Sequence, residues 1–208
     1  MAIAPVVVGV ADHNGWAVLV SVSVKDGSPE VVDRRRVELI EAGLPKQPYE
    51  HETVCLNAVE AERLVQEVRD SAVHCAGRAL SRLRSSLGSS GEMASIALRT
   101  APLPRLPDTV AEVHSSWHAT VRADAMLYHD ALCTSAASMG IRVDTFPRGE
   151  ERPRAAEATA STAERLAQFL NGLRKSLGPP WQLDHQAAAA RAIAALGQYA
   201  TLRLDKSR

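Results

Sequence analysis

The chain contains few aromatic residues and carries no net charge. Aromatic residues make up only 4% of its 208 residues, although hydrophobic residues make up 46%. The core must therefore be built mainly from Ala, Val and Leu, whose small side chains allow helices to pack closely. Lys and Arg together number 24, as do Asp and Glu, so the formal net charge is zero. This balance argues against a protein that coats nucleic acid through an overall basic surface.

Two clusters of arginine leave room for a local basic groove. The first is the run 34–36, and the second comprises Arg78, Arg82 and Arg84. Most runs of like charge only solvate a surface and form local ion pairs. The sequence therefore leaves two interpretations open for these clusters, a solvated surface or a groove for an anionic partner.

Cysteine is also scarce. Cys55, Cys75 and Cys133 are odd in number and have neither CxxC nor metal-ligand spacing. Their apolar, helical surroundings predict small buried thiols in a reducing compartment. The first residues lack the basic and apolar segments typical of a signal peptide, and no apolar run reaches the roughly 18 residues that span a membrane. We therefore expect a soluble, cytoplasmic protein without a membrane partner.

The hydrophobic pattern predicts an α/β fold. Alternating or continuous apolar residues predict five strands, at 5–11, 16–24, 30–40, 93–98 and 141–146. Apolar residues at helical spacing predict four helices, at about 53–87, 108–139, 161–177 and 185–196. The charged, proline-containing segment 149–160 is predicted to be a mobile linker. We expect one domain at 1–200, with a three-stranded antiparallel meander, two further strands and helices on the faces of a mixed sheet, followed by a tail at 201–208.

Two acids stand where such folds carry chemistry. Asp12 lies at the exit of the first strand, and the carboxyl ends of strands are frequent sites of catalysis. An acid beside Asn14-Gly15 is equally suited to forming a turn. Asp184 lies at the start of the last helix, where a carboxylate interacts favourably with the helix dipole or serves as an N-cap. Both acids therefore have a structural and a functional interpretation.

Three stretches resemble the RuvC branch of the ribonuclease H-like superfamily. The first, Val8 to Ala17, consists of a strand, an acid, a glycine turn and the sequence Gly-Trp-Ala. The second, Ala123 to Pro147, is a glycine-ended helix followed by a strand and a proline. The third, Leu183 to Ala192, is similar to the start of the family's final, alanine-rich helix. The resemblance covers most of the chain in the correct order and implies a ribonuclease H-like fold.

The resemblance also implies a metal site, but with an incomplete set of carboxylates. Enzymes of the resembled family hold two Mg²⁺ ions in a cluster of acids for hydrolysis of a phosphodiester. Asp12 matches the first acid and Asp184 the first acid of the last helix. The acid expected at the end of the fourth strand is replaced by Arg99 or Thr100, and Ala187 stands one turn after Asp184. Asp12 and Asp184, with or without help from His185 or His13, make at best one weak Mg²⁺ or Mn²⁺ site. The charge of Arg99 opposes such a site.

Other polar groups are weaker candidates. His114 and His118 have the i, i+4 spacing of helical metal ligands, but no third ligand accompanies them and ordinary surface histidines explain them better. The loop at 50–52, with the sequence Glu-His-Glu, could coordinate a cation, although a polar loop needs no special role. The chain has no glycine-rich phosphate loop, nucleophile elbow or dinucleotide fingerprint.

Three hypotheses follow. The first is a catalytically degenerate domain that binds nucleic acid or a protein partner, and the resemblance implies that its long helices form a homodimer. The alternative is a Mg²⁺-dependent, structure-selective nuclease in which Asp12 and Asp184 bind the ion and Glu112 or Asp108 supplies a further acid. A structural protein whose similarity to the family is coincidental is the third. We favour the first hypothesis because of the missing acids.

Overall fold

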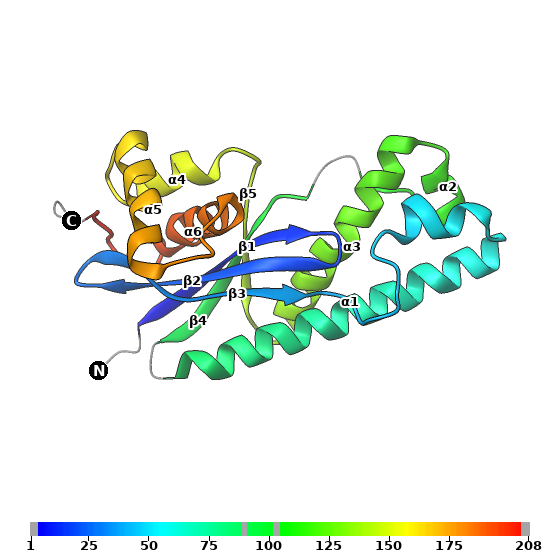
Figure 1. Ribbon diagram of the computed structural model, residues 1–208, viewed down its shortest axis with the longest axis horizontal. Helices are drawn as coiled ribbons and strands as arrows, with labels where there is room; N and C mark the ends of the chain where they lie inside the picture. Colours follow the sequence, from blue (N-terminus) through cyan, green and yellow to red (C-terminus); the bar gives the residue numbers. More distant parts are fainter. Residues whose placement is uncertain (1–3, 89–90, 102–104, 205–208) are drawn as a thin grey trace.

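The computed structural model describes residues 4–88, 91–101 and 105–204 (Figure 1). The strands are β1 (Pro5–His13), β2 (Trp16–Lys25), β3 (Ser28–Glu38), β4 (Glu92–Arg99) and β5 (Arg142–Phe146). The α-helices are α1 (Ala58–Leu87), α2 (Val110–His114), α3 (Trp117–Ser138), α4 (Glu151–Ala158), α5 (Ala163–Leu177) and α6 (Leu183–Leu196). A π-helical turn at Pro48–Glu52 and a 3-10 turn at Thr53–Cys55 precede α1.

The strands form one mixed sheet in the order β3-β2-β1-β4-β5. The first three are antiparallel, whereas β4 is parallel to β1 and β5 is parallel to β4. The β2–β3 turn has Asp26 and Gly27 at its two central positions with φ of 51° and 78°. Positive φ at both positions matches the right-handed twist of a hairpin. The predicted fold class, a five-stranded mixed sheet with helices on its faces, is confirmed.

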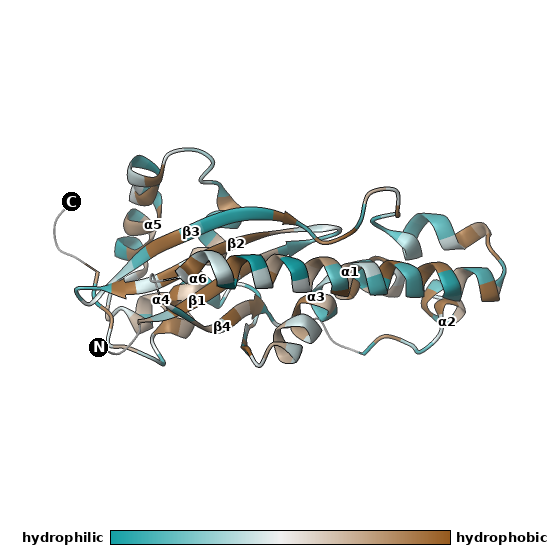
Figure 2. Cartoon of the chain, turned by 90° about the horizontal axis from the view of Figure 1, so that it is seen from below, coloured by the Kyte–Doolittle hydropathy of each residue, from teal (hydrophilic) through white to brown (hydrophobic). Residues whose placement is uncertain are grey.

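Helices cover both faces of the sheet and enclose a separate core on each. One core contains Val6, Val8 and Val10 of β1 together with apolar residues of α1 and α3. The other contains Val7 and Ala11 together with residues of α4, α5 and α6. In Figure 2 the edge strand β3 carries a long hydrophilic stretch, whereas the inner strands are mostly hydrophobic. Alternate side chains of β1 therefore face different helices.

The backbone of α6 lies directly against β1. A Cβ atom added to Gly9 would stand 1.7 Å from the carbonyl oxygen of Ala188. A glycine inside a strand commonly marks such a close approach of two backbones. The alanine-rich sequence of α6 keeps its side chains small and thereby permits this contact.

The structure corrects two predicted elements. Residues 149–160 are not a linker, because 151–158 form α4, whose Ala155 and Ala156 are buried. Pro153 falls in the first turn of this helix, where an N–H group has no intrahelical partner to lose. The helix predicted at 108–139 is broken between α2 and α3. There Ser116 accepts a bond from the N–H of Ala119 (3.5 Å) and begins the second helix.

The end of the described chain packs against the second core. Leu202 and Leu204 are 1% and 7% exposed. The N–H of Arg203 donates to the carbonyl of Gly27 (2.8 Å), which ties this segment to the β2–β3 turn. Among the described residues, no helix is long and apolar enough to cross a bilayer.

Candidate functional site at the end of strand β1

The alternation of β1 separates Asp12 from His13. Because Val8 and Val10 face α1 and α3, the side chain of Asp12 faces the same helices. Because Val7 and Ala11 face α6, the side chain of His13 points to that side of the sheet. The paired register of β1 and β2 is regular from Val7 to His13, so the alternation holds to the end of the strand.

Asp12 is buried between two cationic groups. Its side chain is 4% exposed, and its Oδ2 atom lies 3.7 Å from Nη2 of Arg99 and 3.7 Å from Nδ1 of His129. Burial raises the pKa of Asp12, but His129 and Arg99 lower it by more, so the pKa lies below its ordinary value. Asp12 is therefore an ionised carboxylate held by β4 and α3.

His129 continues this cluster along α3. Its side chain is 8% exposed, and its Nε2 atom lies 3.6 Å from Sγ of Cys133, one helical turn away. Burial lowers the pKa of His129, but Asp12 and Cys133 raise it by more, to well above the ordinary histidine value. The imidazole is thus protonated at neutral pH and forms an ion pair with Asp12 inside the protein.

A third cation, which is buried like His129, comes from α6. Arg191 is 7% exposed and donates from Nη1 to the carbonyl of Val10 (2.6 Å). Its Nη2 atom lies 4.0 Å from Oε1 of Glu151. Burial lowers the pKa of Arg191, whereas Glu151, Asp12 and Asp184 raise it. The end of β1 is therefore surrounded by positive charge from both faces of the sheet.

Asp184 has a different set of neighbours. It lies in the first turn of α6 rather than at its N-cap, which is Gln182, so the N-cap interpretation is wrong by two residues. Its Oδ2 atom lies 3.3 Å from Nε2 of His13, and both side chains are 38% exposed. The ring of His13 stacks on Trp16 with centroids 4.1 Å apart, and Arg36 lies over the same indole at 4.1 Å. The Gly-Trp-Ala sequence thus supplies the centre of a stack that orients His13 toward Asp184.

This donor set does not fit a two-metal centre. Such a centre needs several carboxylates to neutralise two divalent cations, whereas the ion-pair partners of Asp12 are Arg99 and His129. Within residues 4–88, 91–101 and 105–204, no three His, Cys, Asp or Glu side chains are grouped so that they could hold a metal ion. Asp12 and Asp184 therefore interact with separate groups, and the arrangement is an ion-pair cluster.

The remaining candidates have other roles. The carboxylate of Glu112 caps α2, accepting from the Oγ1 (2.9 Å) and N–H (3.3 Å) groups of Thr109, and Asp108 is exposed. His114 lies on α2 and His118 on α3, so the prediction that they stand one turn apart on the same helix is wrong. Nε2 of His114 lies 2.9 Å from the carbonyl oxygen of Tyr49. Residues 50–52 belong to the π-helical turn.

The cysteine prediction is partly wrong. The three thiols are free, but Cys55 is exposed and the other two are half-buried. Cys55 lies in the 3-10 turn before α1 rather than in a packed helix, so its apolar neighbours in the sequence do not cover it.

Two central residues of the cluster were not identified from the sequence. His129 lies on the buried side of α3, and its role depends on how that helix is rotated against β1. Arg191 carries a clearer indication, since it is the only charged residue in an alanine-rich stretch, 187–196, that must be buried. A lone charge in such a helix requires a partner.

Comparison with known proteins defines the class of fold. An antiparallel meander followed by two parallel strands, with helices on both faces, is the ribonuclease H-like fold. No protein-family model matches the chain, and no curated protein gives a significant match.

A search of solved structures finds similar folds. The structure of RuvC from Thermus thermophilus matches 93% of this chain and 95% of its own, with a TM-score of 0.51 and 14% sequence identity. The same protein in complex with a Holliday junction substrate matches with a TM-score of 0.49 and 15% identity, at the same coverage. A Ppx/GppA family member from Aquifex aeolicus matches 79% of this chain and 39% of its own, with a TM-score of 0.38 and 11% identity. The chain therefore has a RuvC-like fold, as the sequence predicted.

Proposed function

We propose that this protein is a ribonuclease H-like domain that binds nucleic acid without cleaving it. The observation that carries the proposal is the ion-pair cluster at the end of β1. Asp12, the counterpart of the first family acid, is paired with Arg99 and His129 at 3.7 Å each. A divalent cation at Asp12 would have to displace two positive groups in a site of low dielectric, where repulsion between like charges is strong.

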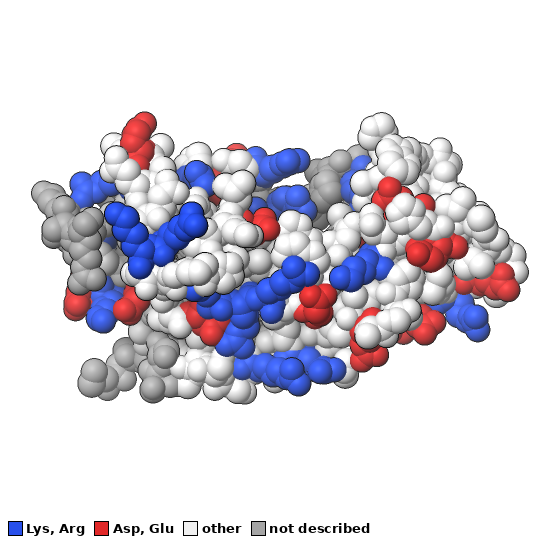
Figure 3. All heavy atoms as spheres, viewed as in Figure 1, with Lys and Arg blue, Asp and Glu red and all other residues white. Residues whose placement is uncertain are grey.

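The surface of the molecule supports nucleic acid as the partner. Lys and Arg side chains gather over the middle of the face shown in Figure 3, across β3 and the helix beside it. Acidic side chains gather instead toward the end of the molecule where α1 begins. This separation gives a chain of zero net charge a local region that attracts phosphate.

The alternative, a Mg²⁺- or Mn²⁺-dependent nuclease that uses Asp12 and Asp184, requires a further carboxylate. Glu112 caps α2 through Thr109, so it would have to break that hydrogen bond to act as a metal ligand.

A cytoplasmic location and a homodimer are further parts of the proposal. Three free thiols agree with a cytoplasmic location. A homodimer is part of the same proposal, because Val59 and Trp117 are 79% and 63% exposed at the starts of the two long helices.

The test combines binding with cleavage. Fluorescently labelled single-stranded DNA, duplex DNA, a four-way junction and an RNA–DNA hybrid are titrated with the protein, first in EDTA and then in Mn²⁺. We expect binding that is equally strong in both buffers and no cleavage in Mn²⁺. Cleavage that Asp12→Asn abolishes would support the nuclease instead. A protein that binds none of the four probes would refute the proposed function.

A further inference from the structure

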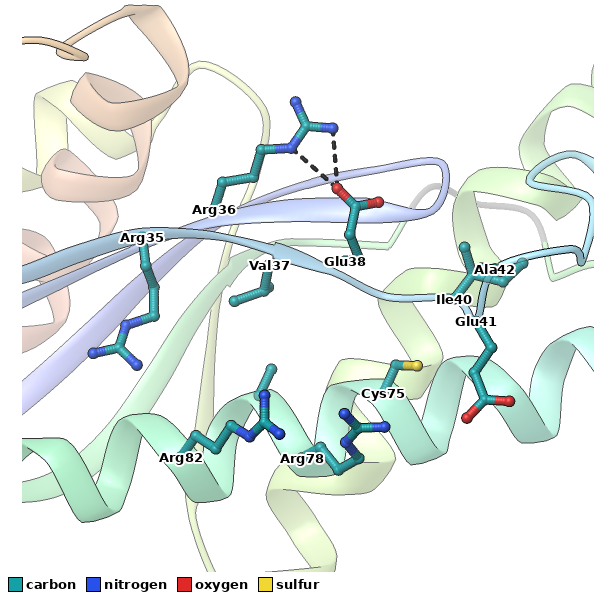
Figure 4. A pocket seen from close by; sticks show the side chains of 11 residues that line it. Arg35, Arg36, Val37, Glu38, Ile40, Glu41, Ala42, Cys75, Arg78 and Arg82 are labelled. Carbon is teal, nitrogen blue, oxygen red and sulfur yellow. Dashed lines mark hydrogen bonds and ion pairs between the residues drawn. The ribbon is translucent and has the colours of Figure 1, made fainter.

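A groove separates the edge strand β3 from the second half of α1 (Figure 4). Its volume is about 640 Å³. The stripe that α1 presents to it consists of Cys75, Arg78, Ala79 and Arg82, which are spaced as i, i+3, i+4 and i+7 and therefore share one side of the helix. This stripe lies outside the ion-pair cluster at the end of β1.

Three guanidinium groups point into this groove. Figure 4 shows the side chains of Arg35, Arg78 and Arg82 directed into the space between β3 and α1. In the same view Arg36 and Glu38 point away from it and pair with each other, with Nε of Arg36 3.3 Å from Oε1 of Glu38. The Arg36–Glu38 ion pair therefore lies outside the groove, whereas the other three arginines line it.

Arg35 is fixed in place across the groove. Its Nε and Nη2 atoms donate to the two carboxylate oxygens of Asp33 (2.8 and 2.5 Å), and Nη2 also donates to Oγ of Ser86 on α1 (2.8 Å). This bidentate pair balances the charge of Arg35 and raises its pKa. Arg35 is therefore held in one position at the side of the groove, and its charge is paired with that of Asp33.

Arg78 and Arg82 have no such partner. Within the part of the chain that the structure describes, neither forms an ion pair with a carboxylate, and both are exposed. Glu41 also lines this groove, and there burial raises the pKa of the Cys75 thiol, Glu41 raises it further and Arg78 lowers it. In the sequence no acid occurs between Asp70 and Glu92, while this interval contains three arginines. Among the described residues, the guanidinium groups of Arg78 and Arg82 are therefore exposed and form no ion pair.

A second groove meets the first along these two arginines. It lies between α1 and α3, has a volume of about 520 Å³, and is lined by Arg78 and Arg82 as well as His74, Ser81 and Ser138. Arg78 and Arg82 consequently form a ridge that is accessible from both sides. Imidazole and hydroxyl groups beside arginine are the side chains that commonly contact phosphate oxygens.

We propose that the β3–α1 groove binds the phosphate backbone of a nucleic acid, with Arg78 and Arg82 as the phosphate contacts. This inference rests on the proposed function and identifies the surface that performs it. Arginine suits the task because its planar group can donate two parallel bonds to one phosphate. Contacts of this kind position a nucleic acid without reading its bases, so binding at the groove is independent of sequence.

The experiment measures the salt dependence of DNA binding by three forms of the full chain. These are the wild type, the double variant Arg78→Ala/Arg82→Ala, and the control Arg63→Ala/Arg174→Ala, which removes two exposed arginines that line neither groove. For duplex DNA each lost phosphate contact should reduce the slope of log K against log salt by about 0.9. We expect the double variant to lose about 1.8 of this slope and to bind about tenfold more weakly or worse, because bonds to charged groups are lost. The control should keep the wild-type slope.

Each other outcome overturns the inference in a distinct way. An unchanged slope in the double variant would refute the role of the β3–α1 groove in binding, but it would not affect the proposed function. Absence of wild-type binding to every DNA probe would refute both. Inorganic phosphate that competes as well as DNA, at equal phosphate concentration, would show a free-anion site. Tighter binding of a polyglutamate peptide, dependent on the same arginines, would show an acidic protein partner. Thermal unfolding of the double variant checks its fold, which we expect to be unchanged because both side chains are exposed.

Discussion

Replacing Asp12 with Asn tests whether the ion-pair cluster stabilises the fold. The side chains of Asp12 and His129 are 4% and 8% exposed, so the substitution leaves the imidazolium buried without its counterion. Loss of one partner from a buried ion pair costs about 3–5 kcal/mol. Arg99 is 34% exposed and can recover part of its hydration. We therefore expect a loss of about 3 kcal/mol in the free energy of unfolding, which lowers Tm by roughly 6–12 °C for a chain of this size.

The dependence of this loss on pH identifies His129 as the partner. The pKa of His129 is raised by Asp12 in the folded protein. Its stabilising contribution is therefore complete below its unfolded pKa of about 6.5 and is lost as pH rises through the folded pKa, by up to about 1.4 kcal/mol per pH unit. Because the folded pKa of His129 is about 10, we expect the free energy of unfolding to fall between about pH 6.5 and pH 10 in the wild type and to be flatter in Asp12→Asn.

Urea unfolding at several pH values supplies the measurement, with Asp184→Asn as the matched control. Asp184 is 38% exposed and pairs with His13 at 3.3 Å, so its loss should cost less than about 1 kcal/mol. An Asp12→Asn protein as stable as the wild type, or more stable, would contradict the claim that the ion pairs of Asp12 stabilise the fold. That result is expected of a carboxylate held near other acids in a metal site.

Three further predictions concern packing and assembly. Gly9→Ala should destabilise the fold by about 3 kcal/mol or more, because the new Cβ would lie 1.7 Å from a carbonyl of α6, whereas Gly172→Ala, with open space around it, should be neutral or stabilising in thermal unfolding. Arg34→Lys should cost about 2 kcal/mol in urea unfolding, because bonds from its guanidinium to four consecutive carbonyls, 177–180, are lost, and an unchanged midpoint would refute this. Trp117→Ser should convert a homodimer to a monomer in light scattering, and a wild-type chain that is monomeric at all concentrations would exclude the dimer.

The fold could be predicted because each element has a local pattern. The apolar residues of β1 and β2 and the positive-φ turn at Asp26-Gly27 define the hairpins without reference to the rest of the chain. The final helix is marked by its alanines and by the need of Gly9 for a close partner. The helix α4 was missed because a short, charged segment with a proline lacks an apolar stripe, and its two buried alanines give a weak pattern.

The candidate site was only half predictable. The sequence places Asp12 at the end of a strand and Arg99 at the end of another, and the alternation of β1 fixes which face Asp12 points to. It does not give the rotation of α3 that brings His129 to Asp12, because that rotation depends on the helix break at Ser116 and on packing against α1. Tertiary contacts of this kind have no local pattern in the sequence.

Calorimetric titration with Mn²⁺ tests the central claim most directly. The claim is that Asp12 is neutralised by Arg99 and His129 and does not serve as a metal ligand. We expect the wild-type protein at pH 7 to give no saturable heat above dilution, and Asp12→Asn and Asp184→Asn to give the same trace. Saturable binding of one or two ions that disappears in Asp12→Asn would contradict the account and establish a metal site.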